Sequence, residues 1–286
     1  MLKTFLISLI IIFFFVAACL NSTTPGSNGE QSQDQQLDKI GVYLTDAVLP
    51  IEEVQNVWLK INEILLISEE ATVVISDEPT VVDLLSLVGT EIRVGEIPAR
   101  TYGQLRLEIS DATITINGES YPLKVSSGSL KYPLQGFYVR PGGSIVLDFD
   151  LSRSIKFTGS ATSSEHQQAH RQYHMTPVIH VRYGHLYDIT GRVIDRDRGV
   201  PHVLLALFET GQASPTAVTL THKGSANWQE GEFKFCKVQP GQYTLKIYTE
   251  WRSSEDPNHI LSTPVATEIS VNVNNQNVDL GNITIR

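Results

Sequence analysis

Residues 105–118 read Leu-Arg-Leu-Glu-Ile-Ser-Asp-Ala-Thr-Ile-Thr-Ile-Asn-Gly, and this stretch decides the fold class. Apolar and polar residues alternate over 105–109, which is the period-two pattern of a β-strand with one buried face. A second strand pattern over 113–116 ends in Asn117-Gly118, the strongest short signal for a hairpin turn. The stretch therefore predicts a strand, a tight turn and a returning strand over 121–125.

Strand signals of the same kind recur on both sides of this hairpin. Residues 81–88 are the one segment that could form a short helix instead. Many short strands separated by turn residues favour a sandwich or a barrel. We therefore predict an all-β protein with two β-sandwich domains, 39–183 and 186–286. The further predicted strands cover 42–44, 57–61, 64–67, 71–75, 144–151, 176–183, 191–195, 200–207, 231–235, 241–247, 268–273 and 278–285.

The first residues predict where in the cell the protein is located. Lys3 precedes an apolar run over 5–16, and Val-Ala-Ala-Cys follows at 16–19, which is the layout of a secretory signal peptide. A cysteine directly after two small residues resembles the bacterial lipobox, so we predict a signal peptide over 1–18 and lipidation of Cys19. A membrane-spanning anchor is the alternative, but the run is shorter than the ~20 residues that a helix needs to cross a bilayer. Residues 19–38 are polar and predict a flexible tether.

Composition excludes some classes of partner. The chain has 286 residues and a formal net charge of −9, and no basic stripe appears. Nucleic-acid binding needs clustered Lys and Arg against phosphate, so we expect no nucleic acid. With Cys19 lipidated, Cys236 is the only thiol left, and an intramolecular disulfide is then impossible. Cys236 lies in an alternating run and is expected to pack as a small apolar residue.

Two tyrosines follow proline turns at the start of alternating strands. Tyr102 comes four residues after Pro98, and Tyr243 comes three residues after Pro240. This arrangement is typical of a tyrosine corner, in which the phenol hydroxyl bonds backbone at the edge of a sandwich. A sugar-stacking tyrosine is the alternative interpretation.

Residues 39–183 resemble domain of unknown function 4382, an all-β module of secreted and lipid-anchored prokaryotic proteins without an established activity. The usual Pro-Ala-Gly-Thr-Tyr turn of that family has Arg100 in place of glycine, which puts a positive φ there in doubt. The matching pieces are Val-Tyr-Leu-Thr-Asp-Ala at 42–47, Val-Asp-Leu-Leu at 82–85, Ile-Pro-Ala-Arg-Thr-Tyr at 97–102, Ala-Thr-Ile-Thr-Ile-Asn-Gly at 112–118, Tyr-Pro-Leu-Lys-Val at 121–125, Leu-Asp-Phe-Asp at 147–150 and Thr-Pro-Val-Ile at 176–179.

Residues 186–286 resemble a carboxypeptidase regulatory-like domain, which is a transthyretin-like sandwich. The matching pieces are Gly-Arg-Val at 191–193, Gly-Val-Pro-His-Val at 199–203, Gly-Glu-Phe-Lys-Phe at 231–235 and Pro-Gly-Gln-Tyr-Thr-Leu at 240–245. The resemblance implies a non-catalytic accessory domain of an envelope protein, although resemblance of fold does not fix function.

Three histidines, His166, His170 and His174, are spaced four residues apart. On a helix this spacing would place three imidazoles on one face, which suits zinc or copper. The segment lacks the apolar stripe that would hold such a helix against a core. The sequence therefore leaves open a metal site and a solvated loop that enters a strand at Tyr173, and it favours the loop.

Asp148 and Asp150 flank Phe149. On a strand both carboxylates would share one face while Phe149 points inward. They could bind calcium or act as an acid–base pair, and the simpler interpretation is a solvent-facing strand with two acids. Trp228 and Trp251 lie near predicted loops, where aromatic side chains suit carbohydrate or peptide surfaces. Trp58 is expected to be buried in the first sandwich.

No motif in the sequence indicates a particular reaction. The sequence has no Gly-x-Ser-x-Gly elbow, phosphate loop or dinucleotide motif. We therefore expect a lipid-anchored protein of the cell envelope, facing the periplasm or the exterior, that binds or scaffolds without catalysis or a cofactor. Its partners would be the membrane, through the lipid, and an envelope protein or a glycan. The alternative is a metal-binding protein or hydrolase that uses the loop 166–174 with Asp148 and Asp150.

Overall fold

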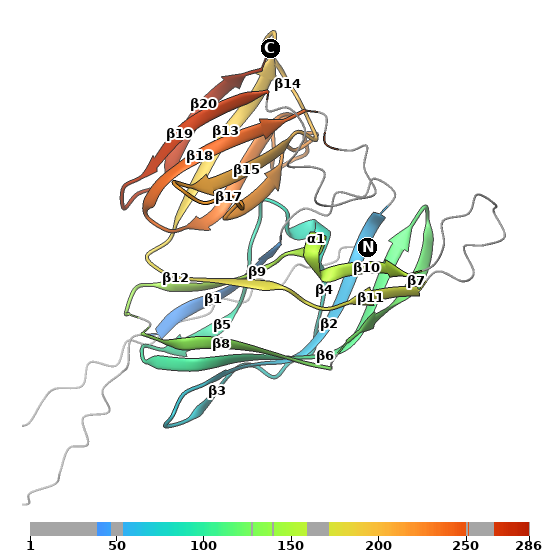
Figure 1. Ribbon diagram of the computed structural model, residues 1–286, viewed down its shortest axis with the longest axis vertical. Coiled ribbons are helices and arrows are strands. Elements are labelled where there is room, and N and C mark those ends of the chain that lie inside the picture. The colour runs from blue at the N-terminus through green and yellow to red at the C-terminus, as the bar shows by residue number, and fades with distance from the viewer. Residues whose placement is uncertain are drawn as a thin grey trace, which may run out of the picture. The chain divides into compact units, whose positions relative to one another are not determined.

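The computed structural model describes residues 39–46, 54–126, 128–138, 140–158, 172–249, 251 and 266–285. Leu37–Arg286 form one compact unit, and strands make up most of the part described (Figure 1). The prediction of an all-β fold of sandwich type is confirmed. A search of the described residues finds no helix with the length and hydropathy needed to span a bilayer.

The first sandwich has two sheets (Figure 1). One sheet has the order β12-β9-β1-β5, and the other has the order β10-β11-β7-β6-β2-β3, with β4 paired to β2 and β8 to β6. A 3-10 helix, η1 (Leu84–Leu87), and a single helical turn, α1 (Leu151–Ser154), connect strands. The strands are β1 (Lys39–Asp46), β2 (Val54–Ile67), β3 (Thr72–Ser76), β4 (Thr80–Asp83), β5 (Ile92–Pro98), β6 (Thr101–Ile116), β7 (Glu119–Val125), β8 (Ser129–Tyr138), β9 (Ser144–Phe149), β10 (Ile155–Thr158), β11 (Gln172–Met175) and β12 (Ile179–Gly184).

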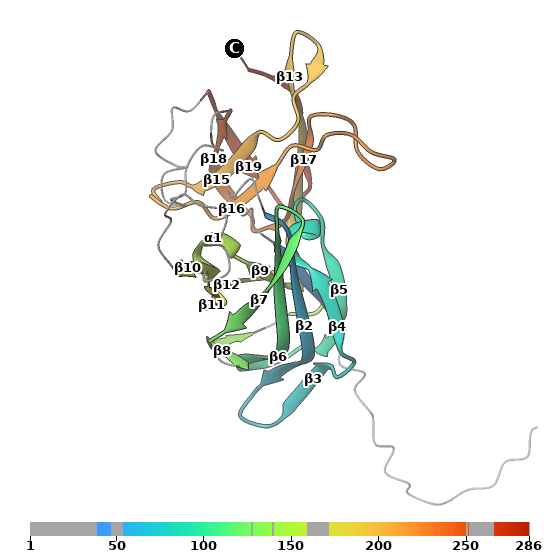
Figure 2. The same cartoon turned by 90° about the vertical axis from the view of Figure 1, so that its right-hand side faces the viewer.

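The hairpin predicted from 105–118 is confirmed. Strand β6 pairs with β7 across Asn117-Gly118, and both turn residues have positive φ, 50° and 83°. This is the backbone that a tight hairpin turn requires and that Asn and Gly adopt at low cost. Strands β6 and β2 run side by side over most of their lengths (Figure 2). Their inward side chains, such as Leu105, Leu107 and Leu59, are fully buried and form the core of this sandwich.

Strands β1 and β12 both pair with β9, but in opposite directions. Strand β1 is parallel to β9, with Gly41 opposite Ser144. Strand β12 is antiparallel to β9, with Gly184 opposite the same Ser144. The beginning of β1 and the end of β12 therefore lie at the same end of this sheet.

The second sandwich starts at β13, three residues after β12 ends (Figure 1). One sheet contains β14-β13-β17, with β20 paired to β13, and the other has the order β16-β15-β18-β19. Phe233, Phe235, Leu245 and Ile247 are buried between them. The strands are β13 (Tyr187–Asp195), β14 (Arg198–Gly199), β15 (Leu204–Glu209), β16 (Ala217–Leu220), β17 (Glu232–Val238), β18 (Gly241–Tyr248), β19 (Thr267–Val273) and β20 (Val278–Thr284).

Both predicted tyrosine corners form. The Tyr102 hydroxyl donates to the Pro98 carbonyl at 2.9 Å, and the Tyr243 hydroxyl donates to the Gln239 carbonyl at 2.8 Å. Both rings are buried, and burial raises the pKa of Tyr102 to about 12 although the nearby Arg100 lowers it. These tyrosines are therefore structural donors at the edges of the two sandwiches and are not available to stack on a sugar.

Candidate functional site

Strand β17 presents charged residues on the face that points away from the core of the second sandwich. Phe233 and Phe235 point into that core, so the alternation of the strand places Lys234 and Cys236 on the opposite face. The alternation breaks at Lys237, whose φ is 55°, and the register with β13 shifts in the same region. A bulge of this kind re-aims side chains.

These residues meet two carboxylates, and we call the set Glu91, Asp188, Lys234 and Lys237 the junction cluster. Glu91 directly precedes β5 of the first sandwich, and Asp188 is the second residue of β13. Lys234 Nζ lies 2.8 Å from Asp188 Oδ2 and 3.2 Å from Glu91 Oε2. Lys237 Nζ lies 3.4 Å from Glu91 Oε1, and its backbone N–H donates to Asp188 Oδ1 at 3.0 Å.

Within the junction cluster, Asp188 and Lys234 hold each other in their ionised forms. Burial disfavours the charged form of Asp188, but hydrogen bonds from Lys234 and from the Lys237 backbone outweigh it and lower the pKa of Asp188. Burial likewise disfavours a charged Lys234, yet the hydrogen bond to Asp188 and the nearby carboxylates raise the pKa of Lys234. A lowered carboxyl pKa stabilises the fold above the unfolded value, and this stability is lost as the pH falls through the folded value.

The thiol of Cys236 lies beside the junction cluster and is unreactive. Cys236 is 5% exposed, and it is expected from the sequence to pack as a small residue. Burial and a hydrogen bond with Glu91 raise the pKa of Cys236, so it carries a thiol and not a thiolate at neutral pH. An ammonium with a raised pKa and a thiol with a raised pKa are both poor nucleophiles at neutral pH.

A buried ion pair lies next to this cluster. Arg182 Nη1 lies 2.5 Å from Asp148 Oδ2, and both side chains are 8% exposed. The same guanidinium donates to two backbone carbonyls of β17, from Nη2 to Cys236 at 3.2 Å and from Nε to Lys237 at 3.1 Å. The left-handed conformation of Lys237 belongs to the bend that carries these two carbonyls. Arg182 therefore joins a carboxylate of β9 to the backbone of the second sandwich.

The expectation that Asp148 and Asp150 share a solvent-facing strand is wrong. Phe149 is buried as expected, but Asp148 is also buried, because Arg182 neutralises it. Asp150 lies beyond the end of β9 and caps α1, where it accepts from the backbone N–H of Arg153 at 3.1 Å. The two carboxylates therefore have separate structural roles and do not form a pair.

Of the three predicted metal-binding histidines, the structure describes only His174, which lies in the other sheet from Asp148. His174 lies on β11 opposite Lys156, and His166 and His170 lie outside the described residues. His180 Nε2 approaches Asp150 Oδ2 at 3.5 Å and Arg153 Nη2 at 2.6 Å. Over the described part of the chain, no group of three or more His, Cys, Asp or Glu side chains could hold a metal ion.

Trp251 and Trp58 lie differently from their sequence predictions, whereas Trp228 lies in a loop as expected. Trp251 is only 5% exposed, and its indole N–H donates to the His202 carbonyl at 2.9 Å, so it is a core residue and not a surface aromatic. Trp228 is half-buried and stacks on the His222 ring at 3.9 Å between ring centres. Trp58, expected to be buried, is 41% exposed on β2. The alternation of β2 assigns Trp58 to the outer face, where nothing in the sequence could show whether another element covers it.

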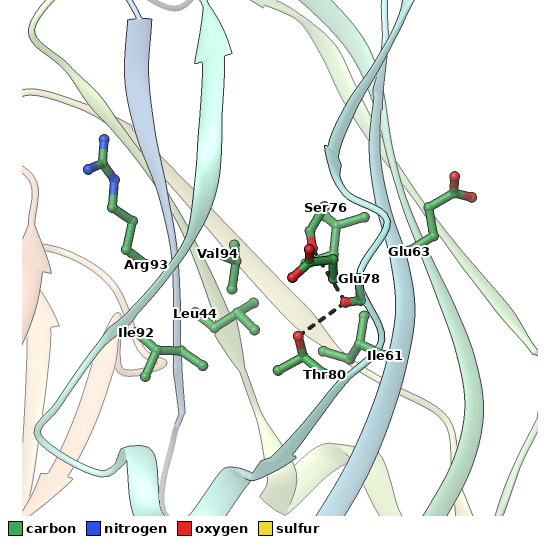
Figure 3. A pocket seen from close by; sticks show the side chains of 10 residues that line it. Leu44, Ile61, Glu63, Ser76, Glu78, Thr80, Ile92, Arg93 and Val94 are labelled. Atoms are coloured by element: carbon green, nitrogen blue, oxygen red, sulfur yellow. Dashed lines mark hydrogen bonds between the residues drawn. The ribbon is translucent and has the colours of Figure 1, made fainter.

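The first sandwich also contains a cavity of about 190 Å³ (Figure 3). Five of its ten lining residues are aliphatic and five are polar or charged, and of the polar ones Glu63 and Arg93 point away from it. The hydroxyl of Thr80 already donates to the Glu78 carbonyl at 3.2 Å. The volume is below the ~300 Å³ typical of a small-molecule site. The aliphatic walls are Leu44, Ile61, Ile64, Ile92 and Val94.

Comparison with known proteins finds a family match for one part of the chain. Residues 39–177 match the family model described as "Domain of unknown function (DUF4382)", which confirms the resemblance of the first sandwich. No curated protein matches the chain.

Several solved structures are similar at low identity. The Bacillus anthracis TIE protein is 10% identical with a TM-score of 0.25, and the alignment covers 87% of this chain and 34% of that one. The shaft pilin SpaA from Lactobacillus rhamnosus GG is 9% identical with a TM-score of 0.24, covering 87% and 98%. BcpA, the major pilin subunit of Bacillus cereus, is 11% identical with a TM-score of 0.26, covering 87% and 69%. This chain thus spans about a third of the TIE protein's length.

Proposed function

We propose that this chain is a lipid-anchored cell-envelope protein whose two sandwiches bind or scaffold a partner without catalysis. The observation that supports it most is the state of four buried or partly buried groups. Cys236 and Lys234 both have raised pKa values, and Asp148 and Asp150 are each neutralised by an arginine. Cys236 and Lys234 held this way are poor nucleophiles, and ion-paired carboxylates stabilise a fold, which supports a role without catalysis.

The predicted lipobox supports the envelope location, and the second sandwich supports an accessory role because it resembles a carboxypeptidase regulatory-like domain. The alternative function, a metal-binding protein or hydrolase, would need imidazoles and carboxylates within about 3 Å of a common point. Asp148 and Asp150 do not meet this need, since each is held by its own arginine.

We expect Cys19→Ala to move the protein from the membrane fraction to the soluble fraction or to leave it unprocessed. Lipid chains on Cys19 would hold the mature protein to the bilayer, because two or more chains anchor a protein stably. Fractionation of cells that express the full chain, followed by carbonate washing and immunoblotting, measures this.

Cys236→Ala is the matched control because it removes the other cysteine of the chain, and it should leave the protein in the membrane fraction. If the Cys19→Ala protein stayed in the washed membranes at its natural size, the lipid anchor would be disproved.

The binding face that we propose is the outer face of β2, β4 and β6 around Trp58. Trp58 lies directly opposite Thr113 on β6, and Lys60 lies opposite Asp111 and Val81. Directly opposed residues share one face of a sheet. Val81 is 58% exposed, so an indole and an aliphatic side chain lie there among donors and acceptors. Such a surface suits the apolar and hydroxyl faces of a glycan.

We expect Trp58→Ala to weaken glycan-array binding of the purified ectodomain by about thirtyfold, the loss typical of a central aromatic anchor. Tyr138→Ala removes an aromatic side chain that is 54% exposed on β8 and should leave the array signal unchanged. An array without any glycan signal, together with capture of an envelope protein that depends on Trp58, would replace the glycan by a protein partner. Equal binding by wild type and Trp58→Ala would exclude this face.

A further inference from the structure

We infer that the end of the first sandwich around Tyr43, Val88, Glu91 and Arg182 is an interaction surface whose partner is the second sandwich, so that the two form a fixed joint. The two strands that meet there, β12 and β13, are separated only by His185 and Leu186. This inference does not depend on the proposed function, because it concerns contacts within one compact unit.

The first step is the polar part of the joint. Glu91 of the first sandwich accepts from Lys234 and pairs with Lys237 of the second. The ammonium of Lys237 also lies 5.5 Å from the ring centre of Tyr43 on β1, within cation–π range. Because these side chains are about four-fifths buried or more, water screens their attraction less than at an open surface.

The second step is a close apolar approach. Val88, which follows η1, packs against a buried cluster on the second sandwich that includes Leu204, Phe208 and Trp251. At the next residue, Gly89, an added Cβ would lie 2.9 Å from His222 Nε2. The two sandwiches are thus in van der Waals contact here, and a larger residue at Gly89 would displace the His222 ring.

The third step is the arginine that serves both sandwiches. Arg182 pairs with Asp148 within the first sandwich and donates a hydrogen bond to each of the Cys236 and Lys237 carbonyls of the second. Without the second sandwich, two of its donors would lose their partners, and the guanidinium would lose its cover. Arg182 and the whole of β12 also lie beyond residue 177, where the family match ends. The region that matches the family model therefore ends before the residues that complete this site.

The experiment opens the connection while leaving the joint in place. A protease site is inserted between His185 and Leu186 of the ectodomain, which is the chain without its predicted signal peptide and lipidated cysteine. The purified protein is then cut at this site. We expect the two halves to co-elute on size exclusion at about 1 μM and to separate only in denaturant. Two halves that elute apart at that concentration, each with the circular dichroism of folded β-structure, would overturn the inference.

A charge reversal tests whether the named contacts hold the halves together. Glu91→Lys places a third ammonium beside Lys234 and Lys237 and should weaken association of the cut halves by about 100-fold. Glu119→Lys makes the same change at an exposed position of β7 and should leave co-elution intact. Equal association of the two variants would show that Glu91 does not hold the joint.

Hydrogen exchange of the uncut chain decides the matter if the cut halves unfold. A fixed joint predicts that the slowest amides of β6 and β18 exchange with one common free energy of opening, and that Glu91→Lys makes the two free energies differ. Separate free energies of opening in the wild type would overturn the inference.

Discussion

Arg182→Ala is expected to lower the free energy of unfolding by about 3–5 kcal/mol, the cost typical of removing one partner of a buried ion pair. The substitution would leave the Asp148 carboxylate buried without its cation. Asp148 Oδ1 already has no hydrogen-bond partner among the described residues. Removing Arg182 would take the cation away from the other oxygen, Oδ2, as well. The carbonyls of Cys236 and Lys237 would lose their donors as well.

Urea unfolding followed by circular dichroism measures this loss. Arg153→Ala is the matched control, since it removes an arginine that pairs with Asp150 but is 55% exposed. An exposed pair of this kind contributes about 0–1 kcal/mol. The double substitution Asp148→Leu with Arg182→Met should recover most of the lost stability, because an apolar replacement of both partners removes the uncompensated charge. A loss below about 1 kcal/mol for Arg182→Ala would mean that Asp148 is not sealed from water.

Gly199→Ala is expected to lower the stability of the protein by about 3 kcal/mol, the upper end of the usual cost of overpacking. A Cβ at this position would lie 1.7 Å from the Glu230 carbonyl oxygen and 2.3 Å from its carbon. These are backbone atoms, so no rotation of a side chain can make space. Gly199 belongs to β14, and the neighbouring Val193–Gly231 and Val200–Val193 hydrogen bonds, at 2.8 and 2.9 Å, would have to lengthen.

Gly211→Ala separates this clash from the general effect of losing a glycine. Gly211 has a φ of 86°, but no atom lies within 4 Å of the added carbon, so the cost should be about 1 kcal/mol of backbone strain. Urea unfolding followed by tryptophan fluorescence measures both variants, since Trp228 and Trp251 report on the second sandwich. The same loss for both variants would show that the backbone at Glu230 can move aside.

The sequence predicted those features that depend on local chemistry. Asn117-Gly118 forms the expected hairpin turn because few residues tolerate two positive φ angles in succession. Tyr102 and Tyr243 form the expected corners, since the acceptor lies four residues away in each case. The one predicted helix is reduced to η1, because residues 80–83 before it pair with β2 as a strand.

The sequence could not show which outward faces are covered. Alternation assigns Trp58 and Asp148 to faces, but the covering group comes from an element far away in the chain. Asp148 is buried because Arg182 lies across from it, and Trp58 is exposed because nothing described covers the outer face of β2 there. The junction cluster could not be found in this way either, since Glu91 lies more than 90 residues from the other three members.

The directions of β1 and β12, the two strands that flank β9, have a mechanical consequence. A pull on residue 39 and on residue 184 would act at one end of the sheet, at two points separated by two strand spacings, about 10 Å. Tension applied there would open the ladders of β9 one hydrogen-bonded pair after another, as a zipper opens, and would not shear all pairs at once. The first sandwich would then lie beside the line of force. Its length would therefore add little to the distance between residue 39 and the second sandwich.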